Sequence, residues 1–414
     1  GEVAAALPLC PAARVPVVPQ GGLTGLSGGS TPVLGSVAIS LERMRGIEDV
    51  DAASGTMVVL AGTPLEAVQE AADAHGLLCP LDLGARGTCA IGGNIGTNAG
   101  GNRTIRYGMT REMVLGLEVV LPDGTVLDSM NRLIKNNTGY DLKQLFIGAE
   151  GTLGIVTRAV LKLPVRPRFV TAAFCGLPDY AAVLRLLAEA KGALGGTLAA
   201  FEVMWPAFYD LMVTKATGVR APLAGRHARY VLLEVQGGDE AFEGPRLEAF
   251  LARLHEEGTL EDAALARSTA DVKAFWALRD AVAEFQHILG PLVGFDLSLP
   301  TAQMEAFVLE AEAAIKAAFP TAVTISFGHV GDGNVHLNAH VPGMAEQPKE
   351  AIDKIVYELI RDRHGSVSAE HGIGTLKRPW LAYARNPVEL ALMRTLKRAI
   401  DPQNLMNPGK ILDA

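Results

Sequence analysis

Long apolar runs, an excess of basic charge and paired cysteines are all missing from this sequence of 414 residues. No apolar run reaches the roughly 18 residues that a membrane-spanning helix needs. The formal net charge is -8, and no basic stripe is visible, which argues against a nucleic-acid-binding protein. The four cysteines are scattered and form no C-x-x-C pair, so they indicate reduced thiols in a cytoplasmic-type compartment and not a disulfide framework.

A dinucleotide fingerprint and a P-loop lysine are also absent from the first glycine-rich loop, residues 19–30. Without G-x-G-x-x-G, the sequence does not predict a nicotinamide cofactor. A starting Met is missing too, because the chain begins at Gly1 and its first residues already have the pattern of a helix in mid-domain. We therefore expect an N-terminal piece of the protein, with any targeting signal, to lie outside this sequence.

Glycine is abundant, with 45 residues gathered mainly between strand-like runs. Residues 19–30 contain five glycines and no acidic residue, so their backbone N–H groups could hold a pyrophosphate, although such a loop can also be a plain tight turn. The pattern predicts a second, longer loop at 83–108, in which residues 87–108 offer three Asn and two Arg donors. Apolar Ile91, Ile95 and Ile105 argue against a surface loop there, so this stretch predicts a buried cofactor.

A change in the sequence pattern at residues 164–167 indicates a domain boundary. Short apolar runs before it predict strands, including a hairpin at Asp123-Gly124. After it, strands alternate with amphipathic helices, which predicts an α+β domain on an antiparallel sheet. The expected strands span residues 14–18, 37–40, 56–60, 115–121, 126–129, 155–163, 169–174, 198–204 and 230–236. The expected longer helices span residues 64–75, 179–194, 239–256, 270–289, 301–317, 346–364 and 387–399.

The segment around Asp332-Gly333 predicts a hairpin with a two-residue turn between two apolar runs. In that register His329 lies directly opposite His336, with Cβ atoms roughly 5 Å apart. The two imidazoles and the carboxylate of Glu370 would make a three-ligand metal site with open positions. His371 is not needed as a ligand and could act as a base. The plainer alternative is a polar hairpin face with a capped turn.

Together, these motifs resemble those of the FAD-linked oxidases of the vanillyl-alcohol oxidase type, in the branch of the D-2-hydroxyacid dehydrogenases. The matching pieces span nearly the whole chain and are residues 19–22, 91–94, 97–101, 106–108, 137–142, 148–155, 329–338, 370–374 and 407–410. The resemblance implies a two-domain α+β flavoprotein. Its FAD-binding domain would be residues 1–164, with the N-terminal part missing, and its substrate (cap) domain residues 168–366. Residues 367–414 would complete the active site and pack on the FAD domain.

The resemblance implies that FAD is bound mainly by the glycine-rich loops. No histidine lies in these loops, so we expect noncovalent FAD, with Cys89 the residue that could instead attach it. Leu23 stands where relatives often have Asn, which puts one polar contact to FAD in doubt. The residues assigned to FAD are Pro19, Gln20, Gly21, Gly22, Thr24, Gly25, Ser30, Gly87, Thr88, Ile91, Gly92, Gly93, Asn94, Thr97, Asn98, Gly100, Gly101, Arg106, Tyr107, Gly108, Glu150, Gly154, Ile155 and Asn407.

The resemblance also implies the chemistry, which is oxidation of a D-2-hydroxy acid to the 2-oxo acid with hydride transfer to flavin N5. A divalent metal on His329, His336 and Glu370 would chelate the substrate hydroxyl and one carboxylate oxygen. Zinc is the first candidate by ligand type, with manganese and iron(II) as alternatives. His371 would accept the hydroxyl proton as general base.

Two further residues are expected to bind the substrate. Asn338 lies two residues beyond His336 and therefore on the same face of the predicted strand. Arg279 matches the anion-binding arginine of the family. Relatives commonly carry Lys at the position of Gly294, and the loss of that charge weakens the case for D-2-hydroxyglutarate. D-lactate and glycolate are the smaller candidates.

The expected partners are the small hydroxy acid and an electron acceptor, which could be an electron-transfer flavoprotein, a quinone or a cytochrome. We expect no nucleic acid, a homodimer as one possible assembly, and a cytoplasmic location, with peripheral membrane association as an alternative. Two other functions stay open at this point. One is a non-redox flavin-dependent transferase like the alkyl-dihydroxyacetone-phosphate synthases, against which the metal ligands argue. The other is an inactive fragment unable to hold FAD.

Overall fold

The computed structural model describes residues 1–412 and divides the chain into two units. The first unit contains residues 1–101, 107–166 and the chain from residue 370 onward, and the second contains residues 102–106 and 167–369. The short segment 102–106 was placed in the FAD-binding domain by the sequence analysis. It belongs to the second unit because Arg103 forms an ion pair there with the buried carboxylate of Glu234.

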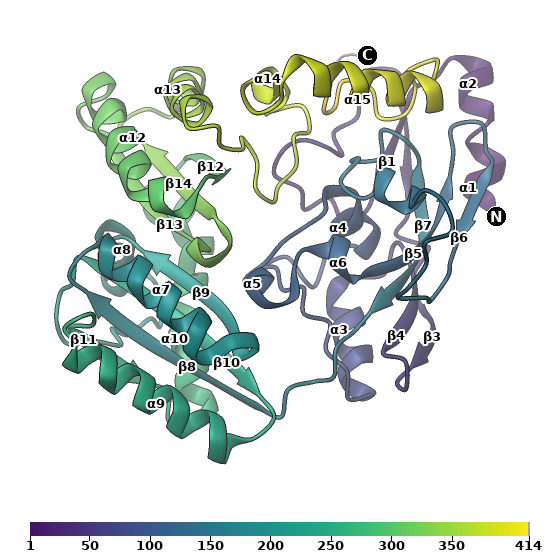
Figure 1. Ribbon diagram of the computed structural model, residues 1–414. Helices are drawn as coiled ribbons and strands as arrows, with labels where there is room; N and C mark the ends of the chain where they lie inside the picture. Colours follow the sequence, from purple (N-terminus) through teal and green to yellow (C-terminus); the bar gives the residue numbers. More distant parts are fainter. Residues whose placement is uncertain (413–414) are drawn as a thin grey trace. The chain divides into compact units, whose positions relative to one another are not determined.

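The first unit is built on a five-stranded antiparallel sheet with the order β3-β4-β7-β5-β6 (Figure 1). Its strands are β3 Ile47–Asp51, β4 Thr56–Leu60, β5 Val114–Val120, β6 Val126–Ser129 and β7 Ile155–Lys162. A separate parallel pair is formed by β1 Val17–Gln20 and β2 Val37–Ser40. The sequence analysis missed β3. The central strands β4 and β7 are buried along most of their length, whereas β3 and β6 are more open.

Helices α3 Leu65–Ala74 and α4 Ile91–Thr97 contribute to the core of this unit. The expectation of a loop throughout residues 83–108 was wrong. Ile91 and Ile95 lie one helical turn apart and are both fully buried, which outweighs the low helix propensity of the glycines between them. The other helices are α1 Glu2–Ala6, α2 Leu9–Ala13, α5 Thr104–Tyr107 at the crossing between units, α6 Thr110–Met113, α14 Leu381–Ala384, α15 Pro387–Ile400 and the short η1 Leu142–Leu145 and η6 Arg378–Trp380.

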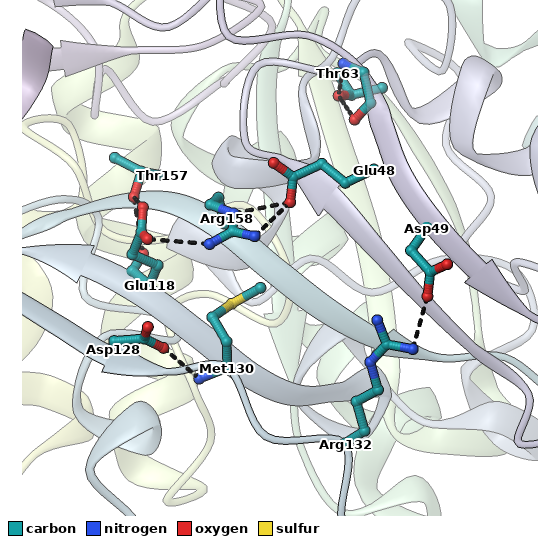
Figure 2. A network of polar contacts seen from close by, with 10 residues as sticks. Glu48, Asp49, Thr63, Glu118, Asp128, Met130, Arg132, Thr157 and Arg158 are labelled. Atoms are coloured by element: carbon teal, nitrogen blue, oxygen red, sulfur yellow. Dashed lines mark hydrogen bonds and ion pairs between the residues drawn. The ribbon is translucent and has the colours of Figure 1, made fainter. Parts of the chain in front are cut away.

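One face of this sheet carries a network of ion pairs, drawn in Figure 2. Arg158 on β7 lies directly across from Glu118 on β5 and donates to it and to Glu48 on β3. Arg132, just beyond β6, pairs with Asp49 on β3. Partly exposed pairs of this kind contribute about 0 to 1 kcal/mol each. The network therefore mainly marks the face of the sheet that is exposed to solvent, and the other face packs against the core.

The second unit contains a seven-stranded antiparallel sheet with the order β11-β8-β10-β9-β13-β14-β12. Its strands are β8 Phe169–Leu177, β9 Leu198–Met204, β10 Arg229–Gly237, β11 Asp262–Leu265, β12 Val293–Ser298, β13 Val323–Gly328 and β14 Asn334–His340. The expected α+β class with an antiparallel sheet is confirmed, and the strand predicted at 198–204 has the predicted bounds.

Helices α8 Pro206–Lys215, α10 Thr269–Asp280 and α11 Phe285–Leu289 bury an aromatic core against this sheet. Helices α7 Tyr180–Leu194 and α9 Glu240–Glu256 lie across β8 and β10 (Figure 1). The expected helix 270–289 is interrupted by the 3-10 turn η3 Ala281–Glu284. The remaining elements are α12 Met304–Ala318, α13 Lys349–Asp362 and the short η2 Gly195–Thr197, η4 Thr301–Gln303 and η5 Val330–Asp332.

The cysteines of the described chain agree with one expectation from composition. All four cysteines are buried and form no disulfide within residues 1–412. Burial raises the pKa of both Cys79 and Cys175 to about 12, as is typical of structural thiols. In the same residues, no helix is both long and apolar enough to cross a membrane.

Helix α15 fixes the end of the chain to the first unit. It begins with a capping box in which Asn386 accepts from the backbone of Glu389 and the Glu389 side chain accepts in return. Near its end, the buried ammonium of Lys397 donates to Asp401 and to the carbonyls of Thr152 and Met406, at 2.5 to 2.8 Å. The chain then runs alongside β1, with Met406 bridging to Val17.

Replacing Lys397 by Met should lower the free energy of unfolding by roughly 3 to 5 kcal/mol, because it leaves the buried carboxylate of Asp401 without its cation. Chemical denaturation monitored by circular dichroism measures this loss. Arg398→Met is the matched control, since Arg398 is the next residue on the same helix and is exposed. An equal loss in both variants would contradict the role assigned to the buried ammonium.

Candidate functional site

A hollow in the first unit is enclosed by three glycine-rich segments. Its empty space, counted out to open solvent, is about 950 Å³. Strand β1 leads into the first segment, α4 carries the second, and the third ends in β7. Of the residues assigned to FAD, those that line the hollow are Pro19, Gln20, Gly21, Gly22, Thr24, Gly25, Ser30, Gly92, Gly93, Asn94, Thr97, Glu150, Gly154 and Ile155.

Two glycines allow these segments to close on one another. A Cβ on Gly22 would lie 1.9 Å from the carbonyl oxygen of Thr88, and a Cβ on Gly92 would lie 2.7 Å from the Cβ of Ala61 and 2.9 Å from its carbonyl oxygen. A Cβ on Gly93, in contrast, would meet no atom within 4 Å, so this glycine faces open space. The wall of the hollow therefore consists largely of backbone, which fits a cofactor whose pyrophosphate is held by N–H groups.

Glu150 lines the hollow and also holds a segment that comes much later in the chain. Its two carboxylate oxygens accept hydrogen bonds from the backbone N–H groups of Ile373 and Gly374, at 2.7 and 2.8 Å. Burial raises the pKa of Glu150, although these two amides and the charges of Lys377 and Lys410 act in the opposite direction. Each oxygen thus has its own amide donor, and the segment after His371 is held firmly against the third glycine-rich segment.

Ser27, in the first glycine-rich segment, holds the same part of the chain from another side. Its hydroxyl donates to the carbonyl oxygen of His371 at 2.9 Å, and its own carbonyl accepts from Thr375 and Leu376. Gly374 has a positive φ of 51°, and a Cβ there would lie 2.1 Å from the Ser27 carbonyl oxygen, so only glycine fits. Residues 370–376, called the His371 loop below, are therefore fixed by two residues of the hollow.

Two residues assigned to FAD have a clear structural role outside the lining of the hollow. The Asn407 side chain donates to the carbonyls of Gly29 and Glu150 and so joins the first and third segments. A Cβ on Gly100 would lie 2.6 Å from Oε1 of Glu370, so this glycine permits the close approach of that carboxylate. Asn407 thus supports the hollow, and Gly100 makes room for Glu370 at the start of the His371 loop.

The other residues assigned to FAD do not line the hollow in the described chain. Ile91 is part of the core, and Asn98 ends α4 in the left-handed conformation while accepting from the Arg111 N–H. The guanidinium of Arg106 donates to the Gln236 carbonyl of the second unit at 2.5 Å. Their contact with FAD stays a prediction. The remaining members of this group are Gly87, Thr88, Gly101, Tyr107 and Gly108.

The two histidines expected to bind metal lie side by side in the second unit, but the predicted hairpin register was wrong. His336 pairs with Phe327 and not with His329, because the connection contains the 3-10 turn η5 and is longer than two residues. His329 directly precedes this turn. The two imidazole centres are 5.4 Å apart with their planes nearly perpendicular. The two rings are therefore close together as expected, although the strand register that brings them together differs from the predicted one.

Glu202 on β9 is the residue that the sequence analysis missed. Its Oε1 accepts from Nδ1 of His329 at 2.5 Å, and its Oε2 accepts from Nε of Arg279 at 2.9 Å. Burial alone would raise the pKa of Glu202, but the electrostatic effect and hydrogen bonds of His329 and Arg279 lower it to about 2. A lone acidic residue in the apolar run 198–204 was the available signal, because a buried carboxylate requires partners.

Arg279 on α10 is buried. Its Nη2 lies 3.2 Å from Nε2 of His329, and its guanidinium lies over the ring of Phe327. Phe327 in turn is the strand partner of His336. The arginine assigned to substrate binding is thus adjacent to the histidine pair within one unit.

Strand β12 brings two further residues to the same region of the sheet. Gly294 pairs with Asn338, and Asp296 pairs with His336. A Cβ on Gly294 would lie 3.0 Å from the side-chain oxygen of Asn338. The carbonyl of Asp296 accepts from the Ala369 N–H at 3.3 Å, so the residue before Glu370 is tied to β12.

The comparisons with known proteins agree with this arrangement. The family model described as an FAD binding domain matches residues 1–129, and that of the C-terminal domain of FAD linked oxidases matches residues 166–411. A mitochondrial D-2-hydroxyglutarate dehydrogenase of Arabidopsis thaliana is 41% identical over 99% of this chain and 73% of its own length. A D-2-hydroxyglutarate dehydrogenase of Xanthomonas citri is 40% identical over 100% of this chain and 87% of its own length.

A solved alkyldihydroxyacetonephosphate synthase has the same fold, with a TM-score of 0.74 over 99% of this chain and 74% of its own, at 18% identity. That likeness concerns the fold alone, whereas the two dehydrogenases are related along the full sequence. The chain therefore belongs to the FAD-linked oxidases of the vanillyl-alcohol oxidase type, in the branch that contains D-2-hydroxyglutarate dehydrogenases, and is an FAD-dependent oxidoreductase.

Proposed function

We propose that this enzyme oxidises a D-2-hydroxy acid to the 2-oxo acid and depends on a divalent metal for the reaction. The observation that carries the metal proposal is the pair of imidazoles of His329 and His336, with Glu202 on Nδ1 of His329. The names of the relatives at about 40% identity support the substrate class. FAD supplies the hydride acceptor when it is bound.

His329, His336 and Glu370 are the proposed metal ligands. Glu370 directly follows Ala369, whose N–H is bonded to Asp296, the strand partner of His336. Glu202 accepts from Nδ1 of His329, which leaves Nε2 of that ring as the ligating nitrogen. Two imidazoles and one carboxylate suit zinc, manganese or iron(II), and a metal there would supply Lewis-acid chemistry.

His371 is the proposed general base for the substrate hydroxyl. Its backbone carbonyl is held by Ser27, and the two residues of the His371 loop that follow Gly372 are held by Glu150. Both anchors line the hollow proposed for FAD. The base is therefore held by the same backbone segments that would hold the cofactor, which favours a fixed direction of proton removal.

Arg279 and Asn338 are proposed to hold the substrate carboxylate, and Gly294 bears on which acid is preferred. Arg279 keeps a fixed orientation through its bond from Nε to Glu202. Gly294 is exposed and adds no charge beside Asn338. We therefore propose a smaller acid, D-lactate or glycolate, ahead of D-2-hydroxyglutarate, the dicarboxylate substrate in the names of the relatives.

The remaining parts of the proposal concern partners. An electron-transfer flavoprotein, a quinone or a cytochrome is proposed as the acceptor, with a homodimer as the assembly and a cytoplasmic location that allows peripheral contact with a membrane. The non-redox transferase alternative is disfavoured, because a metal site formed by the histidine pair and Glu370 would have no function in that reaction.

His336→Ala should slow flavin reduction by a D-2-hydroxy acid at least about 10³-fold, because it removes a ligand of the proposed Lewis acid. Anaerobic stopped-flow absorbance measures the reduction, and elemental analysis measures the bound metal. His340→Ala is the matched control, since His340 lies four residues further along β14 and bonds to the Pro291 carbonyl. It should keep both the metal and the rate. Unchanged flavin absorbance across a panel of D-hydroxy acids, with FAD and metal both bound, would rule out the proposed reaction.

Gly294→Lys should shift the preference toward D-2-hydroxyglutarate by roughly tenfold or more in kcat/KM relative to D-lactate, because a charge beside Asn338 can pair with a second carboxylate. The backbone at Gly294 has no positive φ, so a side chain needs only a small shift of Asn338. Gly294→Ala is the control for that shift. Equal kcat/KM ratios in the wild type, Gly294→Ala and Gly294→Lys would show that this position does not select the substrate.

FAD should leave the protein on acid precipitation. The residues that line the hollow include no histidine, and burial raises the pKa of the Cys89 thiol, which keeps it protonated. The yellow colour is therefore expected in the supernatant, where absorbance and mass spectrometry identify intact FAD. Flavin that stays with the pellet, and is lost from it in Cys89→Ser, would mean a covalent bond. A preparation that stays colourless when FAD is added would instead support an inactive fragment.

A further inference from the structure

We propose that Glu202 is a positioning residue that fixes the ligating nitrogen of His329 and the guanidinium of Arg279 through one buried carboxylate. This inference rests on the proposed function, because it concerns the residues assigned there to metal and substrate. Glu202 itself has no assigned contact with either ligand.

The sheet register places Glu202 where it can reach His329. Strands β9 and β13 are antiparallel, with Met204 opposite Phe327 and Val203 opposite Gly328. The next step of this register brings His329 to Glu202, at the point where β13 ends and the turn η5 begins. The contact between Nδ1 and the carboxylate is therefore a consequence of strand pairing and not of a flexible loop.

The two carboxylate oxygens are divided between two partners. Oε1 faces Nδ1 of His329 at 2.5 Å, and Oε2 faces Nε of Arg279 at 2.9 Å. Glu202 is only 1% exposed, and a buried charge of this kind is tolerated only with compensating partners. The carboxylate, the imidazole and the guanidinium thus form one buried hydrogen-bonded group. Each of the three side chains restricts the orientation of the other two.

The consequence for His329 concerns its tautomer. A carboxylate on Nδ1 requires the proton to be there, so the lone pair is on Nε2, and the negative charge makes that nitrogen a better metal donor. The consequence for Arg279 concerns its direction. With Nε held by Glu202, Nη2 against Nε2 of His329 and the guanidinium over Phe327, the side chain can turn little, and Nη1 keeps one orientation toward an anion.

The decisive variant is Glu202→Gln, which keeps the size of the side chain but provides only one acceptor oxygen. If that oxygen faces Arg279, the amide NH₂ faces Nδ1 and drives the imidazole proton to Nε2. If it faces His329, the NH₂ opposes the guanidinium and releases Arg279. Both arrangements remove the negative charge that strengthens Nε2 of His329 as a metal donor and pairs with Arg279, and each in addition loses the hydrogen bond to one of the two partners. Glu202→Asp keeps the charge and should recover part of both.

A matched control is available on the neighbouring strand. Glu234 on β10 is also 1% exposed and is also paired with an arginine, Arg103, together with Trp276 and Gln236. It contacts none of the proposed metal ligands in the described chain. Glu234→Gln therefore reproduces the loss of a buried carboxylate without touching His329, and it separates a general effect on stability from the proposed positioning.

The measurement is the dissociation constant for Zn²⁺ and for Mn²⁺, obtained by equilibrium dialysis of the FAD-loaded full chain. Glu202→Gln should bind metal roughly 10- to 100-fold more weakly than the wild type, Glu202→Asp should lie between them, and Glu234→Gln should match the wild type. At saturating metal, Glu202→Gln should also raise KM for the hydroxy acid more than it lowers kcat, because Arg279 loses its ionic partner in both arrangements. Unchanged metal affinity in folded Glu202→Gln, or an equal loss in Glu234→Gln, would overturn the proposal.

A second readout separates this inference from the metal proposal itself. ¹⁵N NMR of ring-labelled histidine, assigned with His329→Ala, should report the Nδ1–H tautomer of His329 in the wild type and should show which of the two arrangements Glu202→Gln adopts. If the wild type binds neither metal, the proposed metal function fails, while this tautomer result still decides the role of Glu202. A wild-type His329 that carries its proton on Nε2 would overturn the inference whatever the metal does.

Discussion

The first unit depends on one constraint, which is that four chain segments far apart in the sequence must meet at backbone level. Glycines at positions such as 22, 92 and 374 make this approach sterically possible, and hydrogen bonds from side chains to backbone then hold it. Glu150 provides two of these bonds to the His371 loop, Ser27 provides another, and Asn407 joins the carbonyls behind them. Any side chain larger than hydrogen at these glycines would separate the walls of the hollow.

In the second unit, the functional groups are held in place by a different kind of interaction. There the important groups are side chains of a β-sheet, and a buried charged group fixes their orientation. Glu202 links His329 with Arg279. Both units thus use a buried glutamate near the proposed chemistry. In one unit, the carboxylate is compensated chiefly by neutral amides, and in the other by an imidazole and a guanidinium.

Much of this organisation can be predicted from sequence because it depends on local pattern. The apolar runs gave most strands within a few residues, and the acid-free glycine segments identified most of the lining of the hollow. The register of the histidine hairpin could not be predicted in this way. The pairing of Phe327 with His336 is decided by packing along β9 and β13, which outweighs the local turn preference of Asp332-Gly333.

The burial of Arg279 and the role of Glu202 escaped the sequence analysis for a related reason. Their partners lie 50 and 77 residues from Arg279 along the chain, and no spacing rule connects residues at such separations. The helical turn at α4 was missed because glycine content was weighed above the spacing of Ile91 and Ile95. In each case tertiary contacts decided the outcome and local propensity did not.

The Arg103–Glu234 ion pair has a consequence for dividing the protein into parts. Residues 102–106 interrupt the first unit and belong to the second, so the chain passes between the units at four places and not at a single linker. A fragment that began at residue 167 would contain Glu234 but not Arg103, and so would bury an acid without its cation. The two units are therefore spatial units of one continuous chain and not separable modules. A functional half cannot be obtained by cutting the chain at the domain boundary that the sequence predicts, residues 164–167.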